Sequence, residues 1–93
     1  MPSTKSSINF INASAFDASI YVVDAGGNET HVVDLSPAQS SKQETFEGQI
    51  WVVKDKDTGQ QVGTVTGKVD DQTYEIMFLR GRGAPEQAGG GGG

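Results

Sequence analysis

The chain contains no cysteine and a single histidine, His31, among its 93 residues. The lack of cysteine excludes disulfides, a thiolate nucleophile and thiolate-bound zinc. One histidine excludes a metal site built from several histidines. The sequence also has no glycine-rich phosphate loop between a strand and a helix and no convincing serine–histidine arrangement. We therefore expect no catalytic residue, no cofactor and no metal, and we predict that the protein is not an enzyme.

Clustered basic charge and long apolar stretches are also missing. The net charge is −5, and the few basic residues are scattered apart from Arg80 and Arg82. A surface that binds phosphates needs grouped lysines and arginines, so neither nucleic acid nor an anionic membrane is an expected partner. No apolar run approaches the ~20 residues that span a bilayer, and no signal-peptide pattern is visible. We expect a soluble, cytoplasmic protein.

Short segments rich in β-branched and aromatic residues recur along the chain, whereas helical spacing of apolar residues is nearly absent. Turn-forming stretches such as 24–28 and 55–59 separate them, with glycines that can adopt positive φ. Such a pattern is typical of a β-sandwich or a small barrel. We predict an all-β fold, a small antiparallel β-sandwich of about seven strands with no substantial helix, with strands at 8–12, 19–24, 29–35, 42–46, 49–54, 61–66 and 73–79.

The same composition suggests the domain limits. Residues 1–7 are polar, and we expect a flexible N-terminus there. Residues 81–93 end in a glycine run and have almost nothing to bury, so we expect a disordered tail. The folded sandwich should therefore occupy residues 8–80.

Alternation along the strands predicts which side chains meet in the core. Ile8 and Phe10 share one face of the first strand, and Tyr74, Ile76 and Phe78 share one face of the last. We expect these two sets to pack together. Two other segments, 19–24 and 49–54, are apolar on both faces. For the first of them the pattern leaves open which pair points inward, Ile20 with Val22 or Tyr21 with Val23.

Four sequence elements occur in an order that resembles a known family. They are FINAS at 10–14, IYVVDAGGNE at 20–29, Leu35-Ser36-Pro37, and TFEGQIW at 45–51. From about Ile8 to Gly63 the chain resembles the β-domain family of the von Hippel–Lindau tumour suppressor, as a free-standing β-domain. The resemblance implies a sandwich of about seven strands. The helical domain that links the tumour suppressor to a ubiquitin ligase has no counterpart here, so a ligase-adaptor role is not expected.

The resemblance also implies a ligand site, because the family domain recognises a hydroxyproline-containing peptide. Trp51 matches a pocket tryptophan, Thr45 stands in place of a serine, and Gln49 in place of a histidine. A second tryptophan and a tyrosine of the family pocket fall at Val22 and Val32, so two aromatic walls are lost. Hydroxyproline selectivity should suffer from that loss.

We therefore predict a non-catalytic module that binds a peptide or protein ligand, with prolyl or hydroxyprolyl peptides as candidates. The predicted ligand-binding residues are Trp51, Gln49 and Thr45, with Tyr21 behind them. Trp51 has two interpretations, a core anchor or a partly exposed platform. One alternative is a self-associating structural domain that uses the surface of the second to fifth strands. Another is a carbohydrate-binding module in which Trp51 and Tyr21 stack on sugars.

Two further features are expected to be structural. A lone histidine such as His31 is more often a solvated or hydrogen-bonded side chain than a pH switch. The tripeptide Asp57-Thr58-Gly59 matches that of aspartic proteases, but it lies in a polar turn without the paired carboxylate that such chemistry needs.

Overall fold

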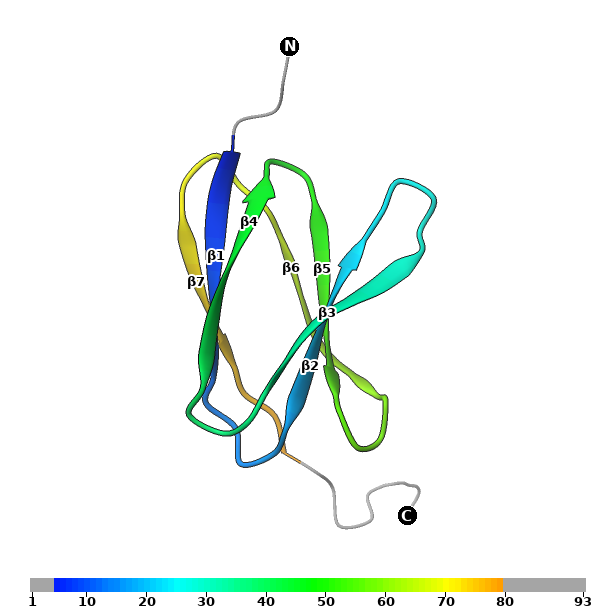
Figure 1. Cartoon of the computed structure of the whole chain (residues 1–93), viewed down its shortest axis with the longest axis vertical. Coiled ribbons are helices and arrows are strands. Elements are labelled where there is room, and N and C mark those ends of the chain that lie inside the picture. Colours follow the sequence, from blue (N-terminus) through cyan, green and yellow to red (C-terminus); the bar gives the residue numbers. More distant parts are fainter. Residues whose placement is uncertain (1–4, 80–93) are drawn as a thin grey trace.

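The computed structural model describes residues 5–79, which form seven strands in two facing sheets (Figure 1). No helix occurs in this part of the chain, and hence none that is long and apolar enough to cross a membrane. The predicted all-β sandwich is confirmed. The strands are β1 (Lys5–Asn12), β2 (Ala18–Val23), β3 (Glu29–Leu35), β4 (Ser40–Phe46), β5 (Ile50–Asp55), β6 (Gln61–Thr66) and β7 (Gln72–Ile76).

One sheet has the order β4-β1-β7 and the other has the order β3-β2-β5-β6. All neighbouring strands are antiparallel except β1 and β7, which pair in parallel with Phe10 opposite Tyr74. The prediction of an antiparallel sandwich therefore holds for every pair but this one. Alternation shows that a strand has an apolar face, but it carries no information on the direction of its partner.

Only β3 and β6 have the predicted limits; β2, β4 and β5 differ by one or two residues at an end, and β1 and β7 differ the most. β1 begins at Lys5, so residues 5–7 belong to the sandwich and not to a flexible terminus. This segment is polar, yet Ser7 donates its backbone N–H to the Asp71 carboxylate and β4 pairs along its other side. β7 ends at Ile76, and Met77 and Leu79 beyond it are exposed. The predicted tail at 81–93 lies outside the described residues.

The core lies between the two sheets, and the predicted sets of side chains meet there. Ile8 and Phe10 of β1 are fully buried together with Ile76 of β7. The Phe10 ring lies 6.1 Å from the Tyr74 ring and 5.6 Å from the Trp51 ring. Each large apolar side chain buried in this way contributes roughly 1.5–3 kcal/mol to folding.

The structure shows which side chains of β2 point into the core. Ile20 is fully buried and Val22 packs against the core, whereas Tyr21 lies on the opposite face. β2 lies between β3 and β5, so its outer face is flanked by side chains of both neighbours. This explains why the segment is apolar on both faces.

Asn12 ends β1 as a fully buried polar residue with all its polar atoms in use. Its amide nitrogen donates to the carbonyls of Phe16, at 2.8 Å, and Leu35, at 2.9 Å, and its amide oxygen accepts from Ser14. Because a buried polar group is costly when unpaired, this network fixes the crossing from one sheet to the other.

Candidate functional site

Three of the four predicted site residues come together where β4 turns into β5. Thr45 is near the end of β4, Gln49 closes the turn, and Trp51 is in β5. The turn is held by the Gln49 N–H, which donates to the Phe46 carbonyl at 3.1 Å. Gly48 has a φ of 91° there, a conformation that glycine adopts without a Cβ clash. The local sequence therefore places Thr45 and Gln49 on the same side of the turn.

A chain of hydrogen bonds joins these three side chains. The Trp51 indole Nε1–H donates to Thr45 Oγ1 at 2.9 Å, and Thr45 Oγ1 donates to Gln49 Oε1 at 3.2 Å. A hydroxyl has one proton and two acceptor lone pairs, so it can take part in both bonds. Within residues 5–79, the Gln49 amide nitrogen has no hydrogen-bond partner. Its N–H groups are available to a ligand.

Trp51 belongs to the core, which settles the two interpretations left open by the sequence. The side chain is 3% exposed and its ring packs against Phe10. Trp51 therefore does not offer a stacking surface. Its contribution to the site is indirect, because its N–H holds the hydroxyl of Thr45, which in turn holds the Gln49 amide.

Tyr21 does not join the other three residues. In the register of the sheet Val22 lies opposite Trp51, while Tyr21 lies opposite Val52 and points to the outer face. There the Tyr21 ring packs 5.4 Å from the His31 ring, and the Lys54 ammonium lies 4.8 Å from its centre. Side chains alternate along a strand, so Tyr21 and Trp51 cannot form one surface. The predicted role of Tyr21 behind the site, and a sugar platform shared with Trp51, do not fit this geometry.

Two open pockets adjoin Gln49. The first has a volume of about 420 Å³ and is lined by Lys5, Glu44, Thr45, Phe46 and Gln49. The second, of about 540 Å³, lies between the β2–β3 turn and the β4–β5 turn, and it shares Phe46 and Gln49 with the first. Gln49 therefore lines both pockets, and a ligand in either pocket can reach its side-chain amide.

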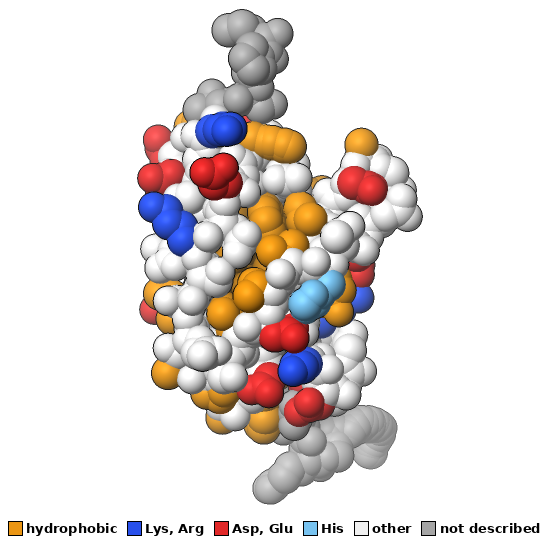
Figure 2. Space-filling model, viewed as in Figure 1, with side chains coloured by type: hydrophobic (Ala, Val, Ile, Leu, Met, Phe, Trp, Pro, Cys, Tyr) orange, Lys and Arg blue, Asp and Glu red, His pale blue; other side chains and the backbone are white. Residues whose placement is uncertain are grey.

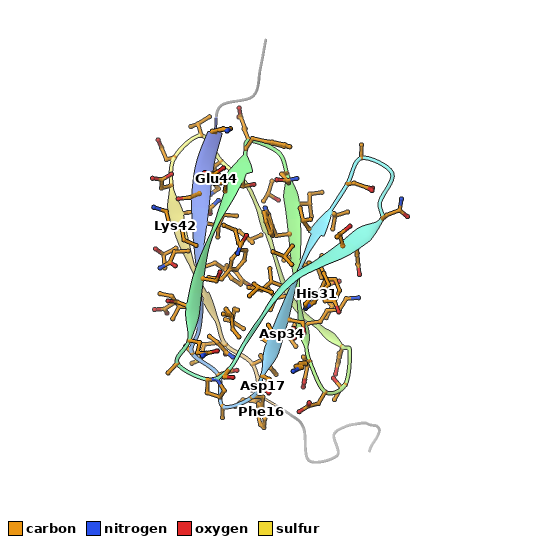
Figure 3. The ribbon with its side chains drawn as sticks, in the orientation of Figure 1. Phe16, Asp17, His31, Asp34, Lys42 and Glu44 are labelled. Carbon is orange, nitrogen blue, oxygen red and sulfur yellow. The ribbon has the colours of Figure 1, made fainter. Side chains whose placement is uncertain are left out.

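The backbone of β4 has a free edge beside the first pocket. The Asn12 N–H donates to the Gln39 carbonyl, and backbone groups alternate in direction along an antiparallel strand. The polar backbone groups of Lys42 and Glu44 therefore point away from β1, and no strand among residues 5–79 pairs with β4 on that side. Both side chains lie along β4 in Figure 3.

Apolar side chains are visible at the opening between β4 and β3 (Figure 2). On β2 and β3, half-buried Val22, Val32 and Val33 pack against the core. An extended segment lying along β4 would therefore meet a backbone edge and an apolar strip together.

A polar network covers the outer face of β2, β3 and β5, and sequence reasoning missed most of it. Asp34 Oδ1 accepts from Ser19 Oγ at 2.6 Å and lies 2.7 Å from His31 Nε2 (Figure 3). The hydrogen bonds from Ser19 and then His31 are the main reasons why the pKa of Asp34 is lowered, with a smaller effect of nearby positive charge. Lys54 pairs with Glu29 at 2.6 Å. His31 is a hydrogen-bonded side chain, as expected.

The network is centred on the Asp34 carboxylate. Ser19 and His31 both contact Asp34, and no hydrogen bond joins them to each other. A nucleophile and its base must be in direct contact. In the part of the chain that the structure describes, no three His, Asp or Glu side chains are grouped so as to hold a metal ion. Only the strand register brings Ser19, His31 and Asp34 together, so no sequence spacing indicates them.

Comparisons with known proteins add little to this geometry. No protein-family model matches the chain, and no curated protein matches it. A solved structure titled "Trapped Toxin" is similar over 76% of this chain, with 13% identity and a TM-score of 0.48. The aligned region covers 22% of that protein's chain, so the present chain spans about a fifth of its length. A likeness this distant carries no argument about function.

Proposed function

We propose that this protein is a non-catalytic binding module that takes an extended peptide, or an extended segment of a protein, along the free edge of β4. The observation that carries the proposal is the side-chain amide of Gln49. Its oxygen accepts from the Thr45 hydroxyl, which in turn accepts from the Trp51 N–H, and its nitrogen has no partner within residues 5–79. A fixed and unpaired donor between two pockets is suited to accept a carbonyl or hydroxyl oxygen of a ligand.

The edge of β4 supports an extended ligand in particular. Its outward backbone groups at Lys42 and Glu44 can pair with an added strand, which supplies affinity through main-chain hydrogen bonds. Selectivity would come from the pockets beside Gln49 and from the apolar strip that includes Val22 and Val33. Charged side chains of the ligand would meet Lys5 and Glu44 on the pocket wall.

The family resemblance suggests a narrower proposal, a ligand that contains proline or hydroxyproline. Gln49 and Thr45 would form the polar part of such a site. A site that hydrogen-bonds a buried hydroxyl rejects ligands that lack it. Val22 and Val32, at the positions of two aromatic walls of the family, would enclose that hydroxyl less well. We therefore expect binding of both peptides with a modest preference for the hydroxylated one.

The test is an amide NMR titration of the labelled full chain with paired prolyl and hydroxyprolyl peptides and an unrelated extended peptide. We expect shifts at the Gln49 side-chain amide, Thr45 and the Trp51 indole, with smaller shifts along β4. Gln49→Ala should abolish the first set, whereas Gln60→Ala, a change in an exposed loop glutamine, should leave binding intact. An absence of shifts at β4 and Gln49 with all of the peptides would refute the proposed surface.

A further inference from the structure

Each sheet has two edge strands, and β6 differs from the other three in carrying no charge. β3 contains Glu29 and Asp34, β4 contains Lys42 and Glu44, and β7 contains Glu75. Charged side chains on edge strands prevent pairing with other chains. β6 reads Gln-Val-Gly-Thr-Val-Thr and lacks this protection. It is the last strand in the order β3-β2-β5-β6, and Figure 1 shows it beside β5.

The backbone of β6 has hydrogen-bonding groups that point outward at this edge. The Gly67 N–H donates to the Gln49 carbonyl at 2.7 Å, so Gly67 faces the β5 side. By alternation, the N–H and C=O groups of Thr66 and Thr64 point away from β5. The Gln72 side-chain amide donates to the Thr66 carbonyl at 3.0 Å, which agrees with this direction.

The sequence of this edge is the same in both directions. Residues 63–67 read Gly-Thr-Val-Thr-Gly, a palindrome centred on Val65. An antiparallel pair of identical strands is related by a twofold axis. Residues at equal distances from the central residue, on its two sides, therefore lie opposite each other. We propose that β6 is a self-association edge, at which two copies of this chain pair antiparallel about a twofold axis at Val65.

The paired geometry is self-complementary. Thr64 of one copy lies opposite Thr66 of the second copy, and Val65 lies opposite Val65. The outward backbone groups of the threonines then form about four hydrogen bonds between the copies. Threonine pairs opposite each other stabilise antiparallel strands. Since β6 is neutral, the net charge of −5 on each copy is not concentrated at this contact.

The Val65 pair continues the core. Val65 lies opposite Trp51 in the register, and its half-buried side chain points inward. Two such valines at a non-hydrogen-bonded position would shield each other from water and join the two four-stranded sheets into one. The Gln72 amide uses one lone pair of the Thr66 carbonyl, and the other remains for the second copy. This surface is separate from the β4 edge and from the surface of β2 to β5 that is the alternative site for self-association.

The first test measures the size of the full chain by sedimentation across a concentration series. We expect a reversible dimer, with an affinity roughly in the micromolar to millimolar range for so small a contact. Thr66→Lys should weaken the dimer at least about tenfold, because two like charges approach across the twofold axis. Thr30→Lys, the same change at an exposed threonine of the opposite edge strand β3, should have no effect. A wild-type monomer throughout the series, or equal effects of both changes, would overturn the proposal.

The second test uses the absence of cysteine from the chain. Val65→Cys places two thiols at a site where paired strands bring the Cα atoms within about 4.5 Å, which suits a disulfide. Val33→Cys makes the matched change at an inward, half-buried valine of the opposite edge strand β3. Mild oxidation should give a linked dimer with Val65→Cys much faster than with Val33→Cys. Equal rates in two folded variants would contradict a contact centred on Val65.

Discussion

The two faces of the four-stranded sheet use the same strands in different ways. On the inner face Trp51 is 3% exposed, contacts Phe10 and donates its N–H to Thr45. On the outer face Tyr21 packs against His31, and Lys54 lies over its ring and pairs with Glu29. Each face therefore has one aromatic side chain that contacts polar partners: a hydrogen-bonded hydroxyl on the inner face and a charged ammonium on the outer face.

What separates the faces is access to water. A buried group that loses its partner cannot recover it from solvent, so each inner contact should matter for stability. Exposed charge pairs are screened and contribute little. The inner face should therefore determine folding and the orientation of Gln49, while the outer face should tolerate change.

Truncating the aromatic residue of each face is the strongest test of this difference. Trp51→Ala should reduce the free energy of unfolding by roughly 3–5 kcal/mol, through lost burial and the cavity left beside Phe10. Tyr21→Ala should cost less, about 1 kcal/mol, since its half-buried ring loses its contacts with the His31 ring and the Lys54 ammonium. Urea unfolding followed by circular dichroism measures both. Equal losses of unfolding free energy in the two variants would show that the outer face contributes to stability as much as the inner face.

Removing one hydroxyl tests the buried hydrogen bond alone. Thr45→Val keeps the shape but leaves the Trp51 N–H without an acceptor and Gln49 without its donor, at a cost of about 1–3 kcal/mol. The Trp51 indole proton resonance should shift, and the Gln49 amide should become mobile. Thr30→Val, at an exposed position, is the matched control and should change stability by less than about 0.5 kcal/mol. A stable Thr45→Val protein with an unshifted indole signal would argue against the network.

A close contact on the inner face of β6 provides a third test. A Cβ at Gly63 would overlap the Tyr74 hydroxyl. Gly63→Ala should therefore destabilise the fold by about 1–2 kcal/mol. Tyr74→Phe removes the overlapping atom, so the double variant should regain most of that loss in a thermodynamic cycle. Additive effects of the two changes would mean that the glycine is needed for another reason.

The outer network should give the smallest effect, and it should depend on pH. The pKa of Asp34 in the folded state lies below its ordinary value of 3.8. The stabilisation is therefore fully present above that ordinary value and is lost as the pH falls through the lowered pKa. Because the group is exposed, Asp34→Asn should cost only a few tenths of a kcal/mol near neutral pH. The difference from wild type should shrink as the pH falls below 3.8 and through the lowered pKa, and a difference that does not shrink would contradict the electrostatic origin.

Much of the fold follows from the sequence because strand alternation and turn chemistry are local properties. The limits of β3 and β6 agree with the predictions, and the contact between the Ile8–Phe10 set and the Tyr74–Ile76 set was predicted from period-two patterning. The grouping of Thr45 and Gln49 was predicted only from the family resemblance. No local signal indicated that residues 5–7 pair, since their partners in β4 and at Asp71 are distant in the chain.

The sequence by itself thus determined the all-β class and most strand positions, and its family resemblance pointed to the cluster at the β4–β5 turn. Only the tertiary structure decided that Trp51 is buried, that Tyr21 faces the other way, that β7 runs parallel to β1, and that Asp34 holds Ser19 and His31. The physical reason is that alternation defines two faces for a strand without saying which one is covered. That choice depends on the register and on the second sheet, which are set by contacts between distant parts of the chain.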